Sequence, residues 1–250
     1  ASLSTGDWIR YVPVPSRYPA DNPRLLARLL GFKAAAGPVW SVTADGVLAV
    51  NTVLADSQPV VATLMTIAGP GVTAPCHVEA LHGTPFAALS DLADREGSIL
   101  INGGVLTGSA IPAEQCGVDL ECRGLTVVPR RTKPEFLAFV LPGEDRLSYS
   151  RCFLSALRLS VSDHTTTHIR GEHRACIACG YCEGVCPAEL LPQVLHRFLY
   201  AEQLDESEAM GLDLCVACGL CTYVCPCKID LQKQFAEAKQ TLLQEAAEAV

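Results

Sequence analysis

The sequence ACIACGYCEGVCPAELLPQ, residues 175–193, places four cysteines within eleven residues and follows the last one with proline. The stretch LCVACGLCTYVCP, residues 214–226, repeats the same spacing and the same ending. Both read Cys-x2-Cys-x2-Cys-x3-Cys-Pro. A pattern that occurs twice at this spacing predicts two equivalent metal-containing sites, and it decides how the last third of the chain folds.

This spacing is typical of chains that bind two [4Fe–4S] clusters. Three thiolates can bind three corners of one cubane, because the small residues Gly180 and Gly219 let the backbone turn closely around it. The fourth cysteine is directed away, and the proline after it turns the chain and has no N–H. We therefore expect crossed coordination, in which each fourth cysteine binds the opposite cluster. Cluster one is predicted to use Cys176, Cys179, Cys182 and Cys225, and cluster two Cys215, Cys218, Cys221 and Cys186.

Zinc and disulfides are the alternative uses of such a cysteine set. A structural zinc site needs four ligands in two separated pairs, whereas two matched quartets supply more. Nine of the 13 cysteines lie between residues 176 and 227, and an odd, clustered set is not typical of a secreted disulfide framework. Cys227 is an additional thiol, expected beside cluster two, and a small buried residue is the favoured interpretation of it. The remaining cysteines are expected to be small core or surface residues: Cys76, Cys116, Cys122 and Cys152.

The segment between the two motifs is too long for a minimal ferredoxin and predicts helices. Leu191, Leu195 and Leu199 recur every four residues, as on the apolar face of a helix. A short helix is expected over 206–212, and Asp230 is expected to cap a last helix. The iron–sulfur unit is therefore predicted to be helical.

The start of the chain predicts a strand, a loop and a helix over residues 8–32. Asn22 is the expected N-cap of that helix, Pro23 its first residue and Gly31 the residue just beyond its end. A second helix is expected over 45–55. This opening resembles half of an α/β layer and has no glycine-rich loop that could bind a flavin or a dinucleotide.

From residue 59 the pattern changes to short strands separated by turns. A strand, a turn, a strand and a helix predict a compact unit similar to half of a ubiquitin-like β-grasp, and the strands that follow predict a small β sandwich over about 98–160. Gly103, Gly104 and Gly108 are expected to serve a tight turn or close strand packing; approach to a ligand is the alternative. The strands are expected over 59–69, 76–81, 98–104, 125–130 and 135–143, and the helix over 83–93.

The net charge and the distribution of apolar residues exclude several classes of protein. A net charge of −8 argues against nucleic acid as a partner, because phosphate binding needs a basic surface. No apolar run approaches the about 20 residues that span a bilayer, and the first residues lack the pattern of a signal peptide. We therefore expect a cytoplasmic location, or a peripheral one on the cytoplasmic face of the inner membrane.

The cysteine-rich tail, CIACGYCEGVCPAELLPQ with CVACGLCTYVCPCKIDL, closely resembles the ferredoxin-like domain of the C subunit of Rnf electron-transport complexes. PVVATLMTIAGPGVTAPCHVEALHGTPFAALSDL resembles that family's soluble-ligand-binding β-grasp (SLBB) domain. ILINGGVLTGSAIP and LTVVPRRTKPEFLAFVLPGEDRLSYSRCFLSAL are more similar to the A subunit of sodium-translocating NADH:quinone reductase. The resemblance implies an α+β chain: a partial α/β segment at 1–58, an SLBB-like β-grasp plus β sandwich at 59–165, and the helical ferredoxin-like domain with two [4Fe–4S] clusters at 166–250.

The segment YVPVPSRYPADNPRLLARLLG resembles the late part of the NADH/FMN-binding domain of these families. Their glycine-rich FMN and NADH loop is absent, so no FMN or NAD is expected on this chain. By this comparison the preceding piece is lost or lies on another chain, or the chain is a shortened member that only relays electrons.

The resemblance implies an iron–sulfur electron-transfer subunit of a multi-subunit oxidoreductase. Electrons would pass between a flavin, NADH or soluble-carrier partner and a membrane or soluble acceptor, and the partners would be flavoprotein or membrane subunits. The alternatives are a ligand-binding or redox-sensing module with structural clusters, and a cobalamin-reductase-like subunit. No catalytic triad, paired acid and base or P-loop is found in the sequence, so no catalytic residue is expected.

Two weaker features remain. His164, His168 and His173 precede the first motif; solvated linker histidines are the favoured interpretation, and a metal site is the alternative. The basic stretch PRRTKP, residues 129–134, is expected at a hairpin tip, with docking of an acidic redox partner as the alternative.

Overall fold

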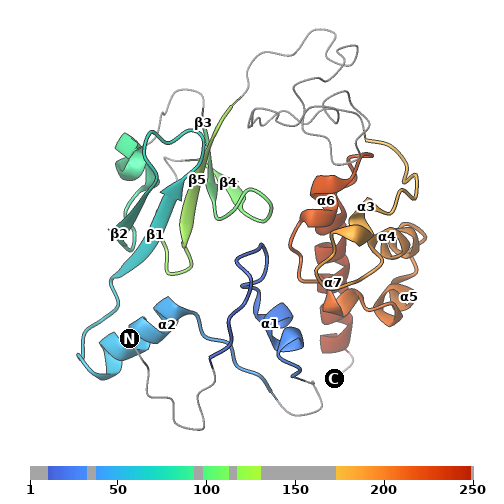
Figure 1. Ribbon diagram of the computed structural model, residues 1–250, viewed down its shortest axis with the longest axis horizontal. Helices are drawn as coiled ribbons and strands as arrows, with labels where there is room; N and C mark the ends of the chain where they lie inside the picture. The colour runs from blue at the N-terminus through green and yellow to red at the C-terminus, as the bar shows by residue number, and fades with distance from the viewer. Residues whose placement is uncertain (1–10, 33–37, 93–97, 113–116, 131–172, 249–250) are drawn as a thin grey trace.

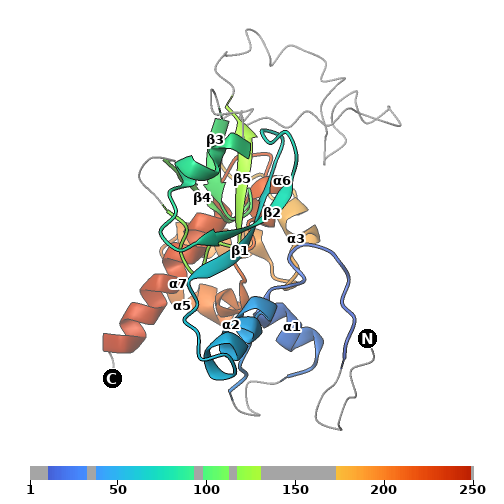
Figure 2. The ribbon, with the colours of Figure 1, turned by 90° about the vertical axis from the view of Figure 1, so that its left-hand side faces the viewer.

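The computed structural model describes residues 11–32, 38–92, 98–112, 117–130 and 173–248. Strands and helices are separated along the chain and in space, as expected for the α+β class (Figure 1). A β-sheet lies on one side and a helical unit that contains both cysteine motifs on the other. Two helices from the start of the chain lie at one end of the molecule, below the sheet (Figure 2).

The sheet has five strands in the order β2-β1-β5-β3-β4. β1 is antiparallel to β2 and parallel to β5, while β3 is antiparallel to both β4 and β5. A 3-10 helix, η2 (Phe86–Leu92), follows β2. The strands are β1 (Ala62–Ala68), β2 (Cys76–Leu81), β3 (Ser98–Asn102), β4 (Ser109–Ile111) and β5 (Gly124–Pro129).

One face of this sheet forms the first hydrophobic core. Met65 and Ile67 alternate with less buried residues along β1, as the two-residue period of a strand requires. Leu125 and Val127 of β5 lie on the same face, and Phe86 of η2 packs against them. Full burial of side chains of this size contributes about 1.5–3 kcal/mol each.

The separate β sandwich predicted over about 98–160 is not found within the described part of that range. β3 and β4 pair into the same sheet as β1 and β2, because β5 lies between β1 and β3 and hydrogen-bonds to both. The strand predicted over 135–143 lies outside the described residues. β1, β2, β3 and β5 confirm the other predicted strands.

The helical unit has the second hydrophobic core. Leu195 and Leu212 are completely buried, and Phe235 is nearly so. The predicted amphipathic helix is α4, and its Leu195 is buried in the core of the helical unit. The last helix is capped as expected, because Asp230 Oδ1 accepts a hydrogen bond from Lys233 N at 3.3 Å. The short helix expected over 206–212 divides into α5 and η4. The helices are α3 (Tyr181–Gly184), α4 (Pro192–Tyr200), α5 (Leu204–Ala209), η4 (Leu212–Leu214), α6 (Leu220–Val224) and α7 (Leu231–Glu248).

The start of the chain is helical where it is described. In α1 (Pro23–Leu29), the N-cap Asn22 accepts from Arg24 N at 3.0 Å and Gly31 follows the helix with a φ of 77°, as predicted. The second predicted helix is α2 (Ala44–Leu54), which buries none of its residues. Residues 11–15 do not form the predicted strand.

Among the described helices, none combines the length and the apolar character that crossing a bilayer requires.

Candidate iron–sulfur centre

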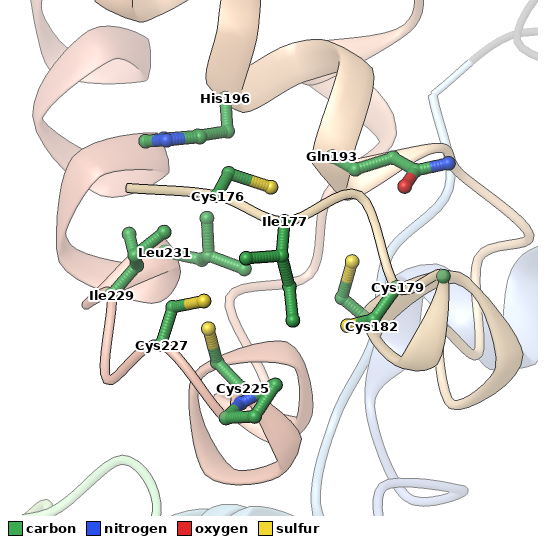
Figure 3. Close-up of a pocket in the computed structure, with 12 residues that line it drawn as sticks. Cys176, Ile177, Cys179, Cys182, Gln193, His196, Cys225, Cys227, Ile229 and Leu231 are labelled. Carbon is green, nitrogen blue, oxygen red and sulfur yellow. The ribbon is translucent and has the colours of Figure 1, made fainter. Parts of the chain in front are cut away.

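The eight motif cysteines line two cavities of the helical unit, four to each. The first cavity is lined by three cysteines of the first motif and the last of the second: Cys176, Cys179, Cys182 and Cys225 (Figure 3). The second cavity is lined by three cysteines of the second motif and the last of the first: Cys215, Cys218, Cys221 and Cys186. These are the two sets of residues that the crossed interpretation groups together.

The two motifs have the same backbone conformation. In each, the residue before the second cysteine, the glycine after it and the residue three after the fourth cysteine have left-handed φ angles, which side chains other than glycine rarely adopt. Successive N–H groups around such a turn face one side and create a concave surface that attracts negative charge. The matched pairs are Ala178 and Ala217 (52° and 53°), Gly180 and Gly219 (76° and 77°), and Glu189 and Lys228 (55° and 56°).

Backbone N–H groups already point at the sulfur atoms. Ala217 N–H donates to Cys215 Sγ at 3.4 Å, and Leu190 N–H donates to Cys186 Sγ at 3.4 Å. Hydrogen bonds of this kind stabilise negative charge on the sulfur and tune the reduction potential of a bound cluster.

Burial keeps several of these thiols protonated. It raises the pKa of Cys182, Cys215 and Cys218 above the usual range. It also raises the pKa of Cys221 to about 12, with smaller contributions from the neighbouring thiols of Cys215 and Cys218. Since iron binds thiolates, loading these sites must release protons.

Two cations lie beside the second motif. Lys239 of α7 donates to the carbonyl oxygens of Cys215 at 2.8 Å and Asp213 at 3.1 Å, and Arg24 of α1 donates to the Asp213 carbonyl at 3.2 Å. Burial and the charge of Arg24 lower the pKa of Lys239. Tyr18 donates from its hydroxyl to the Cys218 carbonyl at 2.7 Å. The start of the second motif is therefore held between the N-terminal segment and α7.

The first cavity has two polar neighbours that sequence reasoning missed. His196 and Gln193 of α4 line it. His196 Nδ1 lies 2.7 Å from Gln234 Oε1, so a hydrogen bond joins α4 to α7 beside this cavity. Gln193 Oε1 is buried without a hydrogen-bond partner in the described part of the chain. No local pattern identifies either residue, since only the packing of α4 brings them to the motif.

Cys227 also lines the first cavity. The expectation that it lies beside cluster two is therefore wrong. Cys225 and Cys227 are separated by a single proline, and this corner directs both side chains into the same cavity (Figure 3). Cys227 is 4% exposed, which agrees with its interpretation as a small buried residue.

The residues present fit an iron–sulfur cluster. Every described cysteine is a free thiol. In the described residues, no group of three or more His, Cys, Asp or Glu side chains is arranged to hold a single metal ion. The motif cysteines instead line two cavities, four to each, as binding of a larger thiolate-bound cluster requires.

The weaker candidates have mixed outcomes. Cys122 is a buried core residue of the sheet, as predicted, and Cys76 is half-buried on β2. Gly108 N donates to the Gly104 carbonyl at 2.7 Å, and a side chain at Gly108 would collide with the Asn102 carbonyl, so the tight turn is confirmed.

The histidines and the basic stretch are described only in part. His173 is exposed. Outside the described residues lie Cys116, Cys152, His164, His168 and 131–134.

Comparison with known proteins agrees with this geometry. Residues 175–229 match the family model of the 4Fe-4S dicluster domain. This match begins one residue before the first motif and contains both motifs completely, so it supports binding of iron–sulfur clusters by the helical unit.

The wider chain is similar to proteins named as the A subunit of Na(+)-translocating NADH-quinone reductase. The one from Tolumonas auensis is 29% identical over 177 residues, which are 69% of this chain and 39% of the relative. The one from Shewanella amazonensis is 30% identical over 174 residues, with the same shares. The one from Alcanivorax borkumensis is 29% identical over 210 residues, which are 82% of this chain and 46% of the relative. The chain thus spans less than half the length of the curated relatives it matches.

Proposed function

We propose that this chain is an electron-relay subunit of a multi-subunit oxidoreductase and that its eight motif cysteines hold two [4Fe–4S] clusters crosswise. The supporting observation is the lining of the two cavities. Each contains three cysteines of one motif and the fourth cysteine of the other. Exchange of the fourth ligand requires the two sites to be close neighbours, which is what transfer between them needs.

The chain's own residues would bind, orient and shield the clusters. The matched left-handed turns direct backbone N–H groups toward the cysteine sulfurs, and Leu195, Leu231 and Phe235 exclude water from the surrounding core. Lys239 places a cation beside the second motif, where its Nζ donates to the Cys215 carbonyl. A [4Fe–4S] cluster supplies reversible one-electron chemistry, while the protein supplies its position and potential.

The electron donor and acceptor would be other protein subunits, a flavoprotein or a membrane subunit. The name of the relatives, which describes one subunit of an NADH-quinone reductase, supports this. The surface of α2 supports it too: Leu48, Val50 and Leu54 are each more than half exposed, and exposed apolar surface of this kind is typical of protein interfaces. We expect neither FMN nor NADH to bind this chain, and we keep the cytoplasmic side as its proposed location.

The sheet is proposed to be an SLBB-like β-grasp domain. Its strand order, with β1 parallel to β5 in the centre and an antiparallel partner outside each, supports this assignment, as does the helical turn η2 after the first hairpin. The boundaries 1–58, 59–165 and 166–250 remain the proposed division of the chain. The sequence resemblance to the C subunit of Rnf complexes supports it alongside the likeness to the reductase subunit.

Pairs of cysteine substitutions test the crossed assignment by counting iron. In crossed coordination Cys186 and Cys218 serve one cluster, so Cys186→Ala/Cys218→Ala should lose half of the iron. Cys182 and Cys186 serve different clusters, so Cys182→Ala/Cys186→Ala should lose nearly all of it. Local coordination, in which each motif closes on itself, gives the opposite result. Iron and sulfide content of the anaerobically purified full chain, with EPR after reduction, decides between the two.

Cys76→Ala is the matched control, because this cysteine lies in the sheet and lines neither of the two cavities. It should retain the full iron content. Reduction with dithionite and reoxidation separates a relay from a structural role. We expect both clusters to go through several such cycles without loss of iron, and loss in the first cycle would contradict the relay.

A further inference from the structure

The second motif carries a cysteine where the first has an alanine. After the fourth cysteine and its proline, the first motif continues with Ala188 and the second with Cys227. The two positions are equivalent in the fold. Each is followed by a left-handed residue, Glu189 or Lys228, and each is almost completely buried, at 3% and 4% exposure.

This difference gives the two cavities unequal numbers of thiols. Ala188 lines the second cavity and Cys227 the first. The first cavity therefore has five cysteines and the second has four. In Figure 3 the side chains of Cys225 and Cys227 are both directed toward the space between the cysteines, and both line the first cavity.

The backbone around Cys227 holds it in this position. Arg174 N donates to the Cys227 carbonyl at 3.0 Å, which ties the corner to the chain just before the first motif. The thiol itself has no hydrogen-bond partner among the described residues. A buried sulfur without a partner, directed at the position of a metal cluster, is placed as a ligand would be.

We propose that Cys227 is a reserve ligand of the first cluster and takes the place of Cys225 when that ligand is lost. The proposal rests on the proposed function, because it assumes a [4Fe–4S] cluster in the first cavity. The second cluster has no such reserve.

The exchange conserves atoms and charge. The bond between iron and Cys225 Sγ breaks and a bond between the same iron and Cys227 Sγ forms. Cys227 gives up its thiol proton and Cys225 takes one up, so no electron is gained or lost. A single proline separates the two residues and both line the first cavity, so the exchange takes place within that cavity.

Iron content of the anaerobically purified full chain tests this directly. Cys225→Ala should keep the iron content of the unsubstituted chain, because Cys227 replaces the ligand. Cys225→Ala/Cys227→Ala should lose half of the iron, while Cys227→Ala alone should lose none. The proposal is overturned if Cys225→Ala loses as much iron as the double variant.

The duplicated motif provides a mirror-image control. Cys186→Ala should lose the second cluster, because Ala188 offers no sulfur. Adding Ala188→Cys to it should restore the iron content. If Cys186→Ala/Ala188→Cys remains at half of the iron, a cysteine two residues after the fourth ligand does not reach the cluster, and the proposal fails.

A measurement on the chain with all eight ligands intact covers the case in which Cys225→Ala does not fold. Cys227→Ser should lose iron to the chelator EDTA several-fold faster than the unsubstituted chain. In this variant an iron atom that loses its bond to Cys225 has no second thiol to bind. Equal rates overturn the proposal. Its failure is distinct from failure of the proposed function, which would appear as a single cluster, or none, in the unsubstituted chain.

Discussion

Gly180 and Gly219 occupy the same position in the two motifs and have the same left-handed backbone, but their surroundings differ. A Cβ at Gly180 meets no atom within 4 Å, whereas at Gly219 it would lie 2.6 Å from the carbonyl oxygen of Leu106. Leu106 belongs to the loop between β3 and β4. Gly219 is therefore where the sheet unit touches the second motif, and the absence of a side chain there permits the contact.

The two glycines give a matched pair of alanine substitutions. Both variants carry the conformational cost of a left-handed residue, about 1–2 kcal/mol, and any effect of a Cβ near a cluster applies to both. Only Gly219→Ala adds a collision with rigid backbone, so it should lower the melting temperature clearly more than Gly180→Ala. Thermal denaturation of the iron-loaded chain measures this. Equal melting temperatures would contradict the contact with Leu106.

At the scale of elements, α1 connects the start of the chain to the iron–sulfur unit. A seven-residue helix is not stable by itself in water. Its Leu25 is buried in the core of the helical unit, and Arg28 donates to the Ala188 carbonyl at 2.6 Å and pairs with Glu189 at 2.9 Å. The ion pair is exposed and contributes at most about 1 kcal/mol. Burial of Leu25 is therefore the main attachment of α1.

Replacement of Leu25 should release this helix. Leu25→Ala removes a buried side chain and should lower the free energy of unfolding by about 2–5 kcal/mol. Leu29→Ala, one turn further along the same helix, changes a side chain that is 68% exposed and should cost less than about 1 kcal/mol. Chemical denaturation compares the two, and limited proteolysis should cut only the Leu25 variant faster near α1. A similar cost for both would rule out the attachment.

At the scale of the whole molecule, the two cores depend on iron to different extents. The core of the helical unit includes Cys182, Cys225 and Cys227 among its buried residues. The core of the sheet has Cys122 as its buried cysteine, and none of the motif cysteines. Iron that binds the motif cysteines thus contributes to the folding energy of the helical unit alone.

Removal of iron should therefore unfold one unit and leave the other folded. We expect a chelator under reducing conditions to abolish amide-exchange protection in 173–248 and to leave it in β1, β3 and β5. Without iron, the four motif cysteines that line each cavity lose the bonds that hold them together, and the core that contains them loses this support. Hydrogen exchange followed by mass spectrometry resolves the two regions. Parallel loss of protection in both would mean that the sheet depends on the helical unit.

The sequence by itself determined what depends on neighbouring residues. The spacing of the cysteines specified the ligand type and the repeated motif, since a few residues decide whether thiolates reach one cubane. Asn22 and Asp230 mark helix starts because a cap bonds to N–H groups two or three residues ahead. β2 was predicted residue for residue because period-two alternation is local. All eight candidate cluster ligands were predicted from the spacing of the cysteines in the two motifs.

Only the tertiary structure decided what depends on residues far apart in the chain. β5 pairs between β1 and β3, and no local pattern encodes that choice, so the described strands form a single sheet where a sandwich was expected. The placement of His196, Gln193 and Cys227 at the first cavity, and of Arg24 and Lys239 at the second motif, follows from packing between helices. Such contacts form because burying apolar surface outweighs chain entropy only for the whole assembled core, a balance that no short stretch of sequence contains.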